Sequence, residues 1–130
     1  MKQVLLIISI LLIVSCAGPS KTGKEARANA HQRMDVVNAD LAAQQAKQQF
    51  EVGQLDTALG TIEAAIARYS KNGEYHLLRG RILLEQHRLD AAFHSLQEAC
   101  KHSPELAEPH YFLGVLHQRW GEDEQAIFEY

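Results

Sequence analysis

Small and large apolar residues recur along this chain at a fixed interval of 34 residues. One column of the pattern is always alanine: Ala58, Ala92 and Ala126. A second column is always alanine or glycine: Ala46, Gly80 and Gly114. Large apolar residues stand four places after each alanine: Ile62, Leu96 and Tyr130. Several columns that share one period predict an array of stacked structural repeats.

Within one period, residues 73–106, apolar positions recur at helical spacing in two segments. The unit is therefore expected to be a pair of helices, with the small residues where the two axes approach most closely. Gly53, His87 and Gly121 occupy the turns between helices, where positive φ suits glycine best. The expected helices are 32–52, 55–69, 73–86, 89–102, 107–119 and a last one that begins near Asp123 and packs through Ala126, Ile127 and Tyr130.

These columns resemble the tetratricopeptide repeat family, whose pattern combines aromatic, leucine-glycine, alanine and proline positions. The middle unit matches the pattern with His76, Arg79, Gly80, Leu83, Ala92, Leu96 and Pro104. The resemblance implies an all-α fold, a right-handed superhelical stack of helix-turn-helix hairpins over residues 32–130. The repeats would be 39–72, 73–106 and a truncated third, 107–130.

The N-terminus has a different character. Lys2 precedes an apolar run, 4–14, that is too short to span a bilayer comfortably and has the plan of a secretory signal. The run ends at Ser15 and Cys16, which resemble the lipobox of bacterial lipoproteins, where the cysteine is acylated. We expect a signal peptide at 1–15, then an acylated cysteine and flexible linker at 16–31. An ordinary signal peptide with an incidental cysteine is the alternative.

The amino-acid composition limits the functions that the chain is expected to have. A net charge of −3 argues against nucleic-acid binding, which usually requires a basic face. Seven histidines raise the possibility of a metal site, but His76 and His110 occupy packing positions of the repeat, and no metal site, cofactor or catalytic residue is expected. Cys100 follows Ala99 on a core-facing helix and is expected to be a buried, unreactive thiol.

Stacked helical hairpins usually bind extended partners on the surface formed by the first helix of each unit. By resemblance, the partner-binding groove would include Gln44, Lys47, Arg81, Tyr111, Gln118 and Arg119. Lys47 and Arg81 are one period apart and would form a basic row suited to an acidic partner. The alternative is that both are simply solvated surface charges.

The sequence thus predicts a non-enzymatic scaffold that binds a protein or peptide and is anchored in the bacterial cell envelope. Ala17 after Cys16 resembles the pattern that favours the outer membrane, facing the periplasm, over the inner membrane. Two other interpretations stay open: the N-terminal region of a larger envelope enzyme, and a histidine-rich metal-binding protein.

Replacing Cys16 with Ser should give a protein that is exported but no longer acylated, because a hydroxyl does not substitute for the thiol in that transfer. Stable anchoring depends on the acyl chains, each buried methylene of which contributes about 0.8 kcal/mol. Metabolic labelling with a radioactive fatty acid measures the difference. Absence of label from the unmutated protein would contradict the lipoprotein interpretation.

Overall fold

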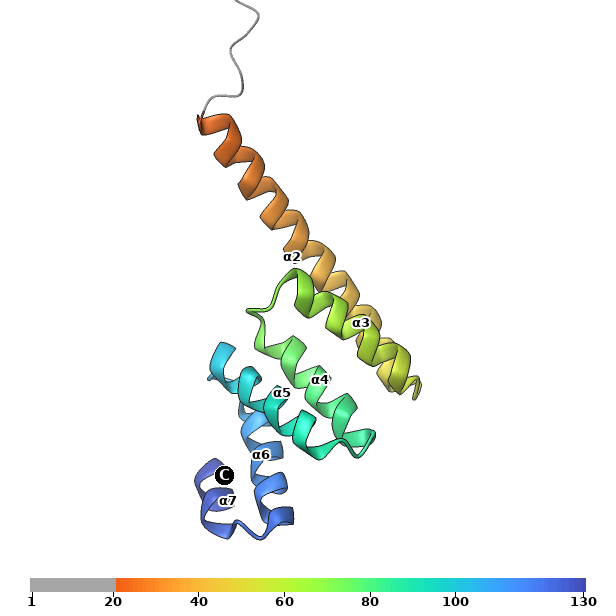
Figure 1. Cartoon of the computed structure of the whole chain (residues 1–130), viewed down its shortest axis with the longest axis vertical. Helices are drawn as coiled ribbons and strands as arrows, with labels where there is room; N and C mark the ends of the chain where they lie inside the picture. The colour runs from red at the N-terminus through yellow and green to blue at the C-terminus, as the bar shows by residue number, and fades with distance from the viewer. Residues whose placement is uncertain (1–20) are drawn as a thin grey trace, which may run out of the picture. The chain divides into compact units, whose positions relative to one another are not determined.

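The computed structural model describes residues 21–130, and within this range every regular element is an α-helix (Figure 1). The helices are α2 (Lys21–Glu51), α3 (Leu55–Arg68), α4 (Gly73–Glu85), α5 (Leu89–His102), α6 (Ala107–Trp120) and α7 (Asp123–Glu129). From the end of α2 onward, the predicted helix boundaries agree with the observed ones to within one residue. The prediction of an all-α fold is confirmed.

The chain divides into two units, 1–33 and 34–130, and the second contains the repeats. Within that unit α4 and α5 lie side by side, as do α6 and α7 (Figure 1). One apolar cluster joins the C-terminal part of α2 to α3 and α4 around Ile62, and another joins α4, α5 and α6 around Leu96. Each cluster draws on more than one hairpin, so burial extends continuously through the stack.

The turns inside the hairpins have the backbone geometry that the sequence predicts. Gly53 and Gly121 have φ values of 78° and 76°. His87, at the equivalent place in the middle unit, has φ of 58° and is the only non-glycine residue with positive φ among residues 21–130. At the start of α4 the Asn72 side chain accepts a 3.0 Å hydrogen bond from the Glu74 backbone N–H, which caps the helix.

The small-residue columns lie at helix contacts. A Cβ placed on Gly80 of α4 would come within 2.9 Å of the Leu96 side chain on α5, too close for the present backbone separation. In the third unit, a Cβ on Gly114 would come within 2.8 Å of the Tyr130 ring. Ala92 and Ala126 are buried as well. The repeated small residues therefore set how closely the two helices of a hairpin approach.

Two expectations for the ends of the domain are wrong. The helix α2 begins at Lys21, so residues 21–31 are helical and not a flexible linker. This segment lacks apolar periodicity, but its alanine, lysine, glutamate and arginine residues favour helix without it. Ile127 is 74% exposed, so α7 packs through Ala126 and not through Ile127.

The predicted signal peptide and Cys16 lie outside the described residues. Within residues 21–130, no helix combines the length and apolar character needed to cross a membrane.

Ala92→Leu should lower the free energy of unfolding by about 1–3 kcal/mol, because Ala92 is fully buried and a larger side chain overpacks the contact. Thermal and chemical denaturation followed by circular dichroism measure the change. Gln97→Ala, at an exposed position of the same helix, is the control and should have little effect. Equal stability of the two variants would mean that the period does not mark a helix interface.

His76 is a buried polar side chain next to the turn between α3 and α4. Its Nε2 lies 2.8 Å from the backbone oxygen of Ser70, and its ring stacks on His102 with 5.2 Å between centroids. Burial lowers the pKa of His76, although the hydrogen bond to Ser70 opposes this effect. The folded protein therefore favours the neutral imidazole.

Acidification should destabilise the domain through His76. The unfolded chain takes up the proton near the ordinary pKa of about 6.5, whereas the folded chain does so only at lower pH, so stability falls as pH decreases through this window. His76→Phe should flatten this dependence in urea titrations between about pH 7.5 and pH 5. The exposed-site variant His94→Gln should retain it. An unchanged pH profile in His76→Phe would assign the effect to other groups.

Candidate functional site

A cavity of about 400 Å³ opens between the first helices of the three units. Its walls come from α2 and α4, with one residue of α6 at the edge. The lining residues are Asp40, Ala43, Gln44, Lys47, Phe50, Glu51, Glu74, Tyr75, Leu77, Leu78, Arg81 and Glu108. We call this cavity the groove.

The groove combines apolar and polar side chains. Phe50, Leu77 and Leu78 are partly or fully buried, whereas Gln44 and Glu74 are exposed. Surfaces of this composition bind a ligand by burying its apolar groups and orienting its polar groups.

A hydrogen bond joins two neighbouring hairpins at one end of the groove. The Tyr75 hydroxyl on α4 donates to Asp40 Oδ1 on α2. Burial, followed by the hydrogen bond and the negative charge of Asp40, raises the pKa of Tyr75 to about 12. The hydroxyl therefore remains protonated, and remains a donor, across the physiological pH range.

The Arg81 guanidinium already has two partners within the protein. Its Nη1 lies 3.4 Å from Oε1 of Glu108 on α6, and its Cζ lies 5.3 Å from the centroid of the Phe50 ring. Stacking on an aromatic face and pairing with a carboxylate both favour the position observed. Arg81 is thus less available to an acidic ligand than the predicted basic row requires.

Sequence reasoning missed the acidic side of the groove. Asp40, Glu74 and Glu108 are separated by the same 34-residue period as the packing residues, and all three line the cavity. With Glu51, the lining holds four carboxylates against the two cations of Lys47 and Arg81. The period itself was the signal that could have identified this row.

The predicted groove residues are only partly brought together. Gln44, Lys47 and Arg81 line the groove. Arg119 lines a neighbouring cavity of about 330 Å³, whose wall is also formed by Phe50 and Arg81. Tyr111 and Gln118 line neither of these cavities, although both are exposed, and Tyr111 contacts the rings of Phe112 and Tyr130.

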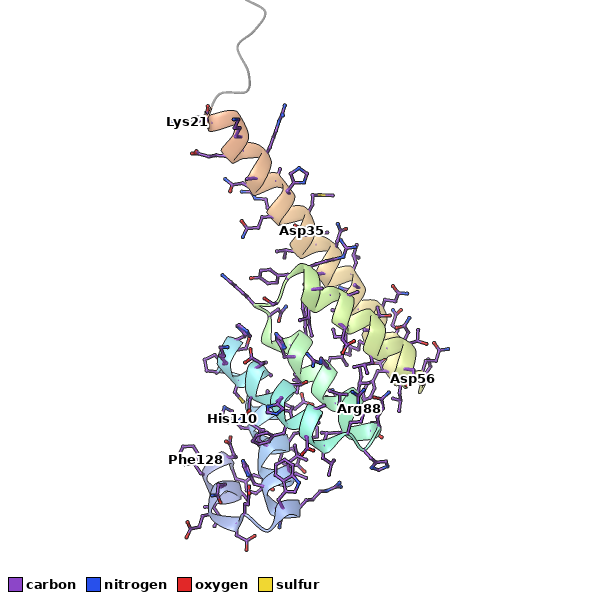
Figure 2. All side chains as sticks on the ribbon, viewed as in Figure 1. Lys21, Asp35, Asp56, Arg88, His110 and Phe128 are labelled. Carbon is purple, nitrogen blue, oxygen red and sulfur yellow. The ribbon has the colours of Figure 1, made fainter. Side chains whose placement is uncertain are left out.

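His110 and His117, both on α6, each contact one carboxylate. His110, labelled on α6 in Figure 2, has Nδ1 2.6 Å from Glu129 Oε2. His117 makes an equivalent contact of 2.6 Å with Glu122. Within residues 21–130, no three histidine, cysteine or acidic side chains are grouped so that they could hold a metal ion. The two observed pairs link α6 to α7 and to the residue that precedes α7.

Cys100 is partly buried against the cluster around Leu96. Burial, and secondarily the charge of Glu129, raises the pKa of its thiol. The side chain therefore stays in the thiol form, which is the weaker nucleophile.

Comparison with known proteins finds similarity to solved structures, and this similarity concerns the fold. No protein-family model and no curated protein matches the chain. Among solved structures, it is similar to MamA, with a TM-score of 0.66 and 21% identity over 71% of this chain and 54% of that one. It is also similar to the second TPR of Spaghetti (RPAP3), bound to the HSP90 peptide SRMEEVD, with a TM-score of 0.77 and 15% identity over 82% and 91%.

A third similar structure is YrrB, a TPR protein with an unusual peptide-binding site. Its TM-score is 0.63, with 22% identity over 71% of this chain and 47% of YrrB. The chain thus spans about half the length of the MamA and YrrB structures. These similarities show that the chain has the TPR fold, the right-handed superhelical stack of helical hairpins.

Proposed function

We propose that this protein is a non-enzymatic scaffold that holds an extended segment of a partner protein in the groove. The observation that carries the proposal is the cavity between α2, α4 and α6, with apolar side chains beneath an accessible polar rim. An extended chain laid across these helices could place apolar side chains on Phe50 and Leu78 while its polar groups meet the rim.

The similar structures support this class of function. The RPAP3 domain is bound to an HSP90 peptide, and YrrB has an unusual peptide-binding site. Because identities are at most 22%, the identity of their ligands does not transfer to this chain.

The second part of the proposal is anchorage in the bacterial envelope through an acylated Cys16, in the outer membrane and facing the periplasm. It rests on the apolar run 4–14, the small residue Ser15 and the thiol at Cys16. Anchoring by acyl chains would hold the groove near the membrane surface, where a scaffold could collect components of envelope machinery.

Site-specific photocrosslinking in intact cells tests the position of the binding surface. A photoreactive amino acid at Gln44, inside the groove, should give covalent adducts with a partner protein. The same substitution at Gln97, an exposed position on α5 that does not line the groove, is the matched control and should give none. Adducts of equal yield at both positions would contradict binding in the groove.

A further inference from the structure

We propose that the groove selects a cationic segment, with lysine or arginine at every third residue and apolar residues between. This inference rests on the proposed function, because it names the chemistry of the ligand for the same groove. The proposed partner segment is cationic, whereas Lys47 and Arg81 in the sequence suggest an acidic partner. Two observations carry it: the acidic row formed by Asp40, Glu74 and Glu108, and the internal pairing of Arg81.

The acidic row has one member on each first helix. Asp40 lies on α2, Glu74 on α4 and Glu108 on α6, and all three are exposed at the edge of the cavity. Within residues 21–130, neither Asp40 nor Glu74 forms an ion pair. Glu74, and the oxygen of Asp40 that does not accept the Tyr75 bond, can therefore accept charge-assisted hydrogen bonds from a ligand.

The cations of the groove compensate this charge only in part. Arg81 is paired with Glu108 and stacked on Phe50, which leaves Lys47 as the lining cation without an ion pair within residues 21–130. Four carboxylates and two cations give the lining a formal charge of −2. A cationic ligand meets a favourable potential at this surface, and an anionic ligand meets an unfavourable one.

The conformation of an extended segment determines the spacing of its charges. The row places one acidic residue on each of α2, α4 and α6, so a segment that crosses these helices must present its cations on one side. In the polyproline II conformation every third side chain faces the same way, and these side chains recur every ~9 Å. A segment in this conformation could present successive cations to Asp40 and Glu74 while its remaining side chains lie on Leu77, Leu78 and Phe50.

Fluorescence anisotropy with synthetic peptides tests the inference on the full chain. The first probe has lysine at every third position, separated by alanine-leucine pairs. The second has the same composition with the lysines placed together, and the third has the acidic sequence SRMEEVD, the ligand of the RPAP3 domain. The first probe should bind most tightly, the third most weakly, and added salt should weaken the first.

Substitutions in the acidic row test whether these carboxylates bind the cationic peptide. Glu74→Gln should reduce affinity for the first probe by about two- to fivefold, the range for one exposed ion pair, and Asp40→Asn should add to this loss. Asn at position 40 still presents an oxygen to the Tyr75 hydroxyl, so packing should be retained. Glu124→Gln, which removes the same charge from exposed α7, is the matched control and should bind like the unmutated chain.

The outcomes separate the two proposals. Tighter binding of SRMEEVD than of the lysine peptides, with loss on Arg81→Glu, would overturn the cationic preference and leave the groove as the binding surface. Equal binding of the two lysine peptides would overturn the three-residue spacing. If the groove variants change the binding of none of the three peptides, both the cationic preference and the groove are wrong.

Discussion

The close approach of two helices at glycine and alanine is the contact on which the rest of the structure depends. At Gly80 there is no room for a side chain, because the Leu96 side chain occupies the space where a Cβ would stand. This contact fixes α4 against α5, and the contacts of α3 with α4 and of α5 with α6 hold each hairpin against the next. The groove has its width because those helices cannot separate without losing buried contacts on either side.

The same repetition organises charge as well as packing. A residue type that recurs every 34 positions occupies the equivalent position in the first helix of each repeat, whether it is buried or exposed. Asp40, Glu74 and Glu108 form an acidic row for that reason. The basic pair, Lys47 and Arg81, follows the same rule, but the contacts of Arg81 with Glu108 and Phe50 change what it offers to a ligand.

Much of the fold could be predicted from the sequence, because small residues and turns leave strong signals. Gly53, His87 and Gly121 mark turns by position, and the structure confirms positive φ at all three. The start of α2 was missed because its first part has helix-forming residues without an apolar face. The groove was predicted less well. The partners of Arg81 come from two other helices, and no local pattern reveals which charges meet across such distances.

The hydrogen bond from Tyr75 to Asp40 has a consequence for how the stack unfolds. It joins the first hairpin to the second, and it lies beside the apolar cluster to which Tyr75 also belongs. In a linear array, such nearest-neighbour coupling decides whether units open one at a time or together. A first hairpin that opened alone would leave a buried aromatic ring exposed on its neighbour. The two hairpins are therefore thermodynamically coupled, and a ligand that stabilises one of them also raises the stability of the other.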